Sequence, residues 1–150
     1  MSVPTRFASV DELLADARSR LCRLTPLRAA EAVAAGARLV DIRPAWQRAG
    51  AGEVPGALIC ERNHLEWRLH PDSPARTPLA RPGQGWIVIC TEGYTSSLAA
   101  DALNSLGVSA SDVIGGFAAW HAAGLPTATG RTPADQLVPA TSSMWPDSTS

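Results

Sequence analysis

The order of apolar and polar residues predicts two helices at the start of the chain. An S-x-x-E sequence beginning at Ser9 has the form of a capping box, and apolar residues recur behind it at helical spacing. This pattern predicts a first helix over residues 9–22. Thr25 and Pro26 are typical of a helix N-cap and first turn, and Gly36 is a typical C-terminal stop, so a second helix is predicted between them.

Four short apolar runs follow, each ending at polar or glycine-rich residues, as is typical of buried strands in a parallel sheet. They cover residues 38–42, 56–59, 86–89 and 112–114. Helical segments at 63–69 and 96–106 separate the later runs. We therefore expect an α/β fold with a central parallel sheet of about four to five strands, flanked by helices on both faces.

The length of 150 residues fits a single domain with short flanking segments. We expect an N-terminal helical extension over 1–24, the α/β domain over 25–126, and a Pro/Ser/Thr-rich C-terminal tail over 127–150. The apolar side chains that this tail could still bury are Leu137, Val138, Met144 and Trp145.

Composition and charge exclude several classes of function. Hydrophobic residues make up 45% of the chain and charged residues 18%, which is typical of a soluble globular domain. A net charge of −1 offers no broad basic surface, so we expect no nucleic-acid partner. No run approaches the roughly 18 to 20 apolar residues of a membrane-spanning helix, and the N-terminus lacks the apolar segment of a secretory signal. We therefore expect a cytoplasmic protein with no membrane partner.

The three cysteines, Cys22, Cys60 and Cys90, lie in different contexts and are odd in number. This argues against a disulfide framework and predicts reduced thiols. Cys60 follows a predicted strand and would be a resolving thiol if it approached Cys90, although a structural role is favoured. His64 and His70 lack the spacing of a helical metal pair, so no metal site is predicted.

The candidate chemistry lies in a short loop that joins the run 86–89 to the following helix. Cys90 opens this loop, which continues through Thr91, Glu92, Gly93, Tyr94 and Thr95 to Ser96, the predicted helix N-cap. Such a loop can point several backbone N–H groups toward one centre, aided by the helix dipole. The resulting cradle favours a thiolate and can hold the terminal sulfur of a persulfide. A buried structural cysteine is the alternative.

Four segments, in order, resemble motifs of the rhodanese family, and the resemblance covers most of residues 25–126. The first two, LVDIR at 39–43 and GEVPGA at 52–57, are similar to the family's Asp-x-Arg strand and Gly-His-Ile-Pro-Gly-Ala turn. Cys90, Gly93 and Ser96 are similar to its Cys-x-x-Gly-x-x-Ser loop. The last segment, GGFAAW at 115–120 running into AGLP at 123–126, is similar to its Gly-Gly-x-x-x-Trp and Ala-Gly-x-Pro motifs.

The resemblance implies a sulfurtransferase with no metal or organic cofactor. In that family, sulfane sulfur is transferred in two steps through a persulfide on the loop cysteine, which is Cys90 here. The implied partners are a small-molecule or protein sulfur donor and a thiol acceptor.

Two departures from the family's loop bear on the choice of donor. Thr95 stands where many members have arginine, and the carboxylate of Glu92 would repel a dianion if it faced the cradle. We therefore expect a persulfide donor rather than thiosulfate. Arg62, after another strand end, is a candidate for the missing positive charge, whereas Asp41 and Arg43 are favoured as an ion pair that braces the loop.

Two other functions stay open on the sequence. One is a rhodanese-homology module that senses sulfur or oxidants, or binds a partner, without turnover. The other is a phosphatase or arsenate-type enzyme with a Cys-x5-Arg loop. The sixth residue after Cys90 is Ser96, so the guanidinium that clamps a phosphoryl transition state is missing there. The sequence indicates no particular oligomeric state.

Overall fold

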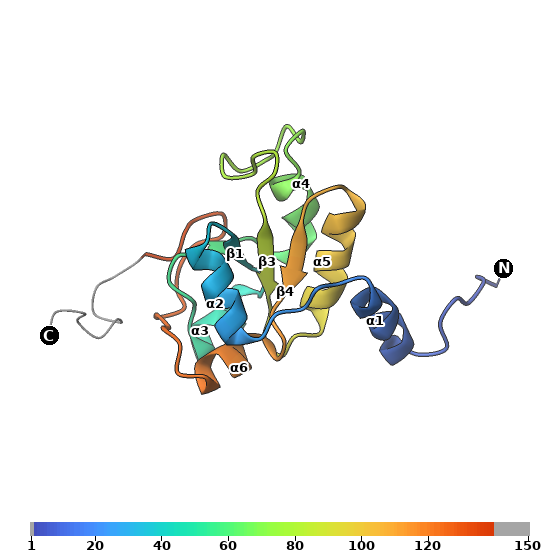
Figure 1. Ribbon diagram of the computed structural model, residues 1–150, viewed down its shortest axis with the longest axis horizontal. Coiled ribbons are helices and arrows are strands. Elements are labelled where there is room, and N and C mark those ends of the chain that lie inside the picture. The colour runs from blue at the N-terminus through green and yellow to red at the C-terminus, as the bar shows by residue number, and fades with distance from the viewer. Residues whose placement is uncertain (1, 140–150) are drawn as a thin grey trace, which may run out of the picture.

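The computed structural model describes residues 2–139, and a four-stranded parallel sheet lies at its centre (Figure 1). In the order β2-β1-β3-β4, its strands are β2 (Leu58–Ile59), β1 (Arg38–Asp41), β3 (Trp86–Ile89) and β4 (Ala110–Asp112). This confirms the predicted parallel α/β fold. The predicted strand at 112–114 begins and ends two residues too late, and beyond β4 Val113 forms only an isolated bridge with Leu24.

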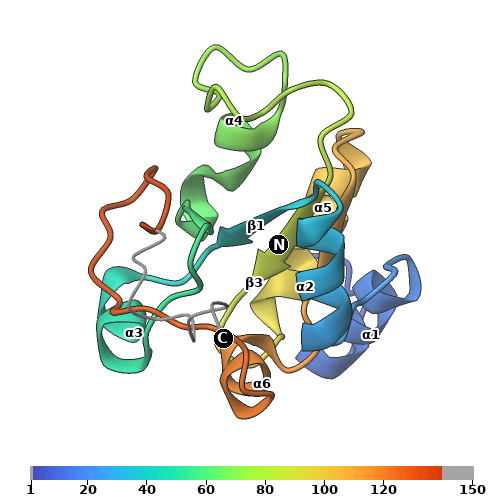
Figure 2. The same ribbon diagram turned by 60° about the vertical axis from the view of Figure 1, so that its left-hand side comes forward.

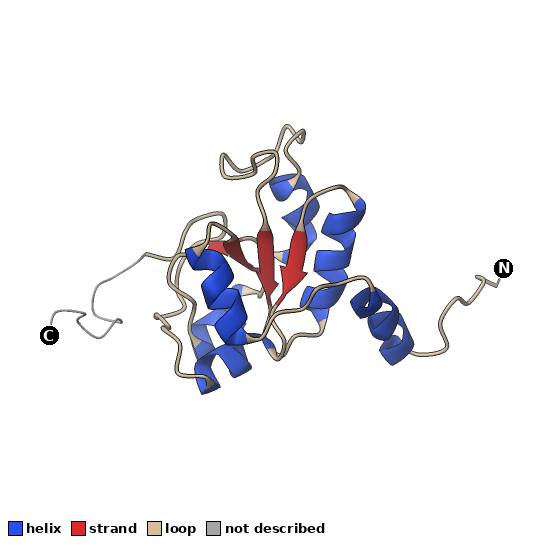
Figure 3. Cartoon of the chain, viewed as in Figure 1, coloured by secondary structure: helices blue, strands red, loops and turns tan. Residues whose placement is uncertain are grey.

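Helices cover both faces of the sheet (Figure 3). They are α1 (Val10–Ser19), α2 (Pro26–Ala34), α3 (Ala45–Ala51), the 3-10 helix η1 (Arg62–His64), α4 (Leu65–Leu69), α5 (Thr95–Ser105) and α6 (Gly116–Ala122). Helices α2 and α6 pack on one face, while α4 and α5 pack on the other. None of the helices within residues 2–139 has the length and apolar character needed to cross a membrane.

Alternate strand residues point to opposite faces of the sheet, and both faces are buried. Leu39 and Ile87 belong to the core under α2 and α6, whereas Val40 and Val88 belong to the core under α4 and α5. Strands β2 and β3 are buried at every position, which explains why they read as continuous apolar runs.

The two N-terminal helices begin where their capping residues predict. The Ser9 hydroxyl accepts the N–H of Glu12 at 3.1 Å. Helix α1 nevertheless ends three residues before the predicted boundary of 22. Leu24 causes this early end, because its N–H donates to the carbonyl of Asp112 at 2.9 Å and extends the sheet beyond β4.

Helix α3 has no counterpart in the sequence prediction. It starts after Pro44 without a side-chain cap, and its buried residue is Arg48, which is 2% exposed. Because this helix is short and its buried residue is charged, large apolar residues do not recur along it at helical spacing. The sequence pattern therefore does not indicate a helix here.

The described part of the predicted tail, residues 127–139, lies against the outer edge of β2. The N–H of Val138 donates to the carbonyl of Ala57 at 2.8 Å, and the Val138 side chain is 2% exposed. Figure 2 shows this segment, in red, passing beside α3. The rest of the predicted tail, with Met144 and Trp145, lies outside the described residues.

A buried ion pair ties this C-terminal segment to α3. Arg48 donates to the Glu53 carboxylate at 2.5 Å and to the carbonyl of Thr132 at 2.7 Å. The Thr132 hydroxyl donates to the second oxygen of Glu53 at 2.7 Å. The glutamate stands where the motif that this turn resembles has histidine, and in this chain Arg48 and the C-terminal segment both donate hydrogen bonds to it.

Candidate active site

The predicted loop lies at the carboxyl end of β3, the strand that β1 and β4 flank. A pocket with a volume of about 470 Å³ opens there. Cys90 and Tyr94 from the loop, Arg43 and Gln47 from the region of α3, and Arg62 from η1 all contribute to its lining. A pocket beyond the carboxyl ends of parallel strands is the expected place for a ligand in this class of fold.

Cys90 sits at the base of the pocket and is 4% exposed. Its Sγ accepts the N–H of Gly93 at 3.2 Å, so at least one backbone donor of the predicted cradle is directed at the sulfur. Gly93 has a φ of +88°, and an added Cβ would lie 2.9 Å from the nitrogen of Gly115. Only glycine fits both this backbone conformation and this close approach.

The N-terminus of α6 holds the base of the same loop. The N–H of Phe117 donates to the carbonyl of Cys90 at 2.7 Å, and the N–H of Ala118 donates to the carbonyl of Thr91 at 3.0 Å. Gly116 allows this contact, because a Cβ there would lie 2.7 Å from the carbonyl carbon of Thr91. The pair Gly115-Gly116 therefore allows the N-terminus of α6 to lie close to the Cys90 loop.

Ser96 does not cap α5, and that prediction is wrong. The helix begins at Thr95, with Tyr94 in the cap position, and Ser96 is buried inside its first turn. The Ser96 hydroxyl instead donates to Asp112 at 2.9 Å, and the Ser97 hydroxyl donates to the same carboxylate oxygen at 2.8 Å. The buried Asp112 at the end of β4 takes both hydroxyls, so neither is free to cap the helix.

Asp41 and Arg43 form a buried ion pair beside the pocket. Arg43 donates to Asp41 at 2.6 Å and to the carbonyl of Gly52 at 2.8 Å, and its guanidinium lies 4.3 Å from the ring centroid of Phe117. The Nη1 of Arg43 is buried and has no hydrogen-bond partner within residues 2–139. Arg43 therefore both braces the strand end and contributes to the pocket wall.

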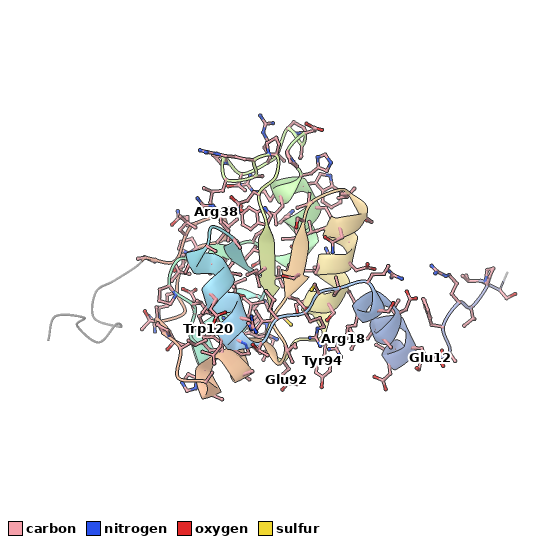
Figure 4. All side chains as sticks on the ribbon, viewed as in Figure 1. Glu12, Arg18, Arg38, Glu92, Tyr94 and Trp120 are labelled. Carbon is pink, nitrogen blue, oxygen red and sulfur yellow. The ribbon has the colours of Figure 1, made fainter. Side chains whose placement is uncertain are left out.

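Arg62 and Glu92 lie toward the mouth of the pocket. Arg62 donates to Glu66 at 2.6 Å, with 37% of its side chain exposed, so its charge is already paired. Glu92 and Thr95 are exposed, and Figure 4 shows Glu92 and Tyr94 pointing outward from the lower edge of the molecule. The Glu92 carboxylate therefore faces the solvent side of the pocket and not the sulfur of Cys90.

Cys60 lies too far from Cys90 to form a disulfide with it. The register places Cys60, Ile42 and Cys90 side by side one residue beyond the paired strand ends, so two strand spacings, about 9.6 Å, separate the cysteines. Burial raises the pKa of the Cys60 thiol to about 12, and the charge of Asp135 adds to this. The resolving-thiol role proposed for Cys60 therefore has no structural support.

Several residues of this site were missed by the sequence reasoning. They are Arg18, Arg23, Gln47, Ser97 and Asp112. Only Asp112 carried a signal, as a carboxylate next to a buried apolar run. Within residues 2–139, no group of three or more His, Cys, Asp or Glu side chains is arranged to hold a metal ion.

Comparisons with solved structures give proteins of the same fold. A Rhodopseudomonas palustris protein of unknown function, described as a possible tyrosine phosphatase, is 29% identical with a TM-score of 0.74, over 84% of this chain and 99% of that one. A rhodanese-related protein from Thermoplasma volcanium is 21% identical with a TM-score of 0.57, over 69% and 94%. A thiosulfate sulfurtransferase from Pseudomonas aeruginosa is 24% identical with a TM-score of 0.59, over 79% and 21%.

A comparison with the curated proteins gives no match. The model of the rhodanese-like domain family matches residues 25–123, which contain the sheet, the Cys90 loop and both glycine motifs that shape it. The chain belongs to the rhodanese-like domain family.

Proposed function

We propose that this protein is a sulfurtransferase that carries sulfane sulfur as a persulfide on Cys90. The observation that carries the proposal is the environment of the Cys90 sulfur. It lies at the base of a pocket, accepts a backbone N–H, and stands at the end of a strand whose loop leads into a helix N-terminus. These features favour an anionic sulfur.

In the first step, the Cys90 thiolate attacks the outer sulfur of a donor persulfide, R–S–SH. A new S–S bond forms at Cys90 while the S–S bond of the donor breaks. The donor leaves as the thiolate R–S⁻ with the bonding electron pair, and the SH group is now on Cys90. Backbone N–H groups of the loop stabilise the negative charge on sulfur at each stage.

In the second step, the thiolate of an acceptor attacks the outer sulfur of the Cys90 persulfide. The acceptor gains the SH group, and Cys90 leaves as a thiolate with the electron pair of the broken bond. Neither step needs an external oxidant or reductant, because each sulfur that gains a bond is matched by one that loses a bond.

The charges around the pocket favour a persulfide donor over thiosulfate. Arg43 is paired with Asp41, and Arg62 is paired with Glu66. Glu92, at the mouth, forms no ion pair within residues 2–139, so the mouth carries an excess negative charge. A dianion entering there meets repulsion that a singly charged or neutral persulfide meets less.

The proposal is tested by mass spectrometry of the purified protein after exposure to glutathione persulfide and, separately, to thiosulfate. We expect one added sulfur on the Cys90 peptide with glutathione persulfide, and no added sulfur in Cys90→Ser. A Cys60→Ser variant is the matched control and should load as the parent does. A protein that gains no sulfur on Cys90 from either donor would contradict the proposal.

Multiple turnover separates an enzyme from a sensing module. We expect continuous sulfur transfer to cyanide or a thiol acceptor when donor is in excess. A single loading event without turnover would favour the non-enzymatic module instead.

A phosphatase is the second candidate, favoured by the description of the Rhodopseudomonas palustris relative. Residues Cys90 to Ser96 contain no arginine, and the Ser96 hydroxyl is engaged by Asp112. Without a guanidinium in the loop, a transferring phosphoryl group lacks its main clamp. We expect no hydrolysis of p-nitrophenyl phosphate that depends on Cys90, and Cys90-dependent hydrolysis would favour the phosphatase.

A further inference from the structure

Helix α1 lies outside the residues matched by the family model, yet one of its side chains reaches the active loop. Arg18 donates through Nη2 to the carbonyl of Gly93 at 2.7 Å and through Nε to the hydroxyl of Ser97 at 3.1 Å. Its guanidinium also lies 5.8 Å from the ring centroid of Tyr94. Figure 4 shows Arg18 and Tyr94 side by side at the loop.

A second arginine, between α1 and α2, binds the same carbonyl. Arg23 donates through Nη2 to the Gly93 oxygen at 3.1 Å and through Nε to Asp112 at 2.9 Å. The Ser97 hydroxyl also lies 3.3 Å from this oxygen, but its single proton is donated to Asp112. One loop carbonyl therefore has two donors, both on guanidinium groups, which form stronger hydrogen bonds than neutral donors.

The orientation of this carbonyl fixes the direction of the neighbouring N–H. In a planar trans peptide the C=O and N–H bonds point in opposite directions, so the N–H of Tyr94 points away from both arginines. Cys90 and Tyr94 both line the pocket, and the N–H of Gly93 in the same loop already points at the Cys90 sulfur. The N–H of Tyr94 has no acceptor among residues 2–139. Donors on the carbonyl also polarise the peptide, which strengthens its N–H as a donor.

We propose that Arg18 and Arg23 are positioning residues that orient and polarise the Gly93–Tyr94 peptide, so that its N–H binds the anionic sulfur carried on Cys90. The inference deepens the proposed function, on which its sulfur-transfer part rests. It also explains how the loop works with Thr95 in place of arginine. Asp112 neutralises Arg23, whereas Arg18 forms no ion pair within the described residues, so a positive charge stands behind the cradle instead of inside it.

Arg18→Met tests the inference, with Arg20→Met as the matched control. Arg20 is on the same helix but binds Asp16 and Asp101, away from the loop. We expect alkylation of Cys90 by iodoacetamide at pH 7 to slow about threefold to tenfold in Arg18→Met, because a charge acting through the peptide is lost. The alkylation profile should move to higher pH, and kcat should fall more than KM rises. Arg20→Met should leave all three unchanged.

Arg18→Lys is the conservative variant. Lysine keeps the charge but cannot place two fixed donors on Gly93 and Ser97 together, so its alkylation rate should lie between those of the parent and Arg18→Met. A thermal unfolding curve shows whether each variant is folded. If Arg18→Met does not fold, the inference is tested with Arg18→Lys alone.

Identical Cys90 alkylation profiles in the parent, the Arg18 variants and Arg20→Met would overturn the inference. Alkylation is read at the Cys90 peptide and needs no sulfur donor, so it reports on the arginines even if the protein transfers no sulfur. A parent that takes up no sulfur would contradict only the proposed function.

Discussion

The carboxylate of Glu92 stands at the mouth of the pocket, exposed to solvent, while the arginines that line the pocket are paired with other carboxylates. We expect its charge to act on a charged donor before the donor reaches Cys90. Because the side chain is exposed, removing the charge should change selectivity between donors and leave the fold unaffected.

We predict that Glu92→Gln raises kcat/KM for thiosulfate about threefold to tenfold at low ionic strength, because one repulsive charge is lost. Thr95→Arg should act in the same direction, and a neutral persulfide donor should respond to neither change. Glu31→Gln, which removes an exposed charge on α2 outside the pocket, is the control. Equal thiosulfate kinetics in all four proteins would show that charge at the mouth does not set donor choice.

Individual residues of the site were predictable where the chemistry depends on local sequence. The place of Cys90 and Gly93 in a loop between a strand and a helix could be predicted, because a cysteine opening a glycine turn after a strand is itself a pattern. Arg18 and Arg23 could not be identified, because their partners lie 75 and 70 residues away along the chain and nothing local indicates the contact. Ser96 was wrongly predicted as the helix N-cap, because nothing in the sequence around it indicates its hydrogen bond to Asp112, 16 residues away.

At the level of elements, α3 and the C-terminal segment are joined through the buried pair of Arg48 and Glu53. Both side chains are nearly inaccessible, at 2% and 0% exposure. Burying charges is costly unless each is paired and hydrogen-bonded, and here Thr132 provides the additional bonds. The segment 127–139 therefore supplies hydrogen bonds to the buried Arg48–Glu53 pair in addition to covering the edge of β2.

We predict that Glu53→Gln lowers the free energy of unfolding by about 3 kcal/mol, because Arg48 would be left as a buried charge without a counterion. Urea titration followed by tryptophan fluorescence measures the change. Asp101→Asn, which removes one partner of an exposed ion pair with Arg20, should have a much smaller effect. Equal effects of the two substitutions would show that burial does not set the strength of the Arg48 pair.

The elements themselves were predictable to different extents. The strand at 86–89 was predicted with its observed bounds, because a fully buried strand in a parallel sheet is apolar at every position. The helix at Ala45–Ala51 was not, because its inward residue is an arginine. Residues 127–139 were predicted as a tail because their few apolar residues gave no sign of hydrogen bonds to β2.

At the scale of the whole molecule, Cys60 reports on the integrity of the core. Its thiol is 0% exposed, and its pKa of about 12 keeps it protonated in the folded protein. In the unfolded chain a cysteine ionises near roughly 8.5. Because the pKa of Cys60 is higher in the folded than in the unfolded state, its contribution to the free energy of unfolding is fully present below about pH 8.5. This contribution is lost as the pH rises toward 12.

We predict that Cys60 escapes iodoacetamide at pH 8 in the native protein, whereas the exposed Cys22 is modified. Low concentrations of urea should accelerate modification of Cys60 and leave that of Cys22 nearly unchanged, because only Cys60 has to wait for unfolding. Peptide mass spectrometry distinguishes the two sites. Modification of both cysteines at similar rates in the absence of urea would contradict this prediction.

The hydrogen bonds on the Gly93 carbonyl have a consequence for the order in which the protein matures. Their donors come from Arg18 and Arg23, near the start of the chain, and Arg23 is itself held by Asp112, 89 residues later. During synthesis, the loop leaves the ribosome before Asp112 does. The hydrogen bonds that we propose to position the Gly93–Tyr94 peptide can therefore form completely only once the last strand has been made and the first helix has docked.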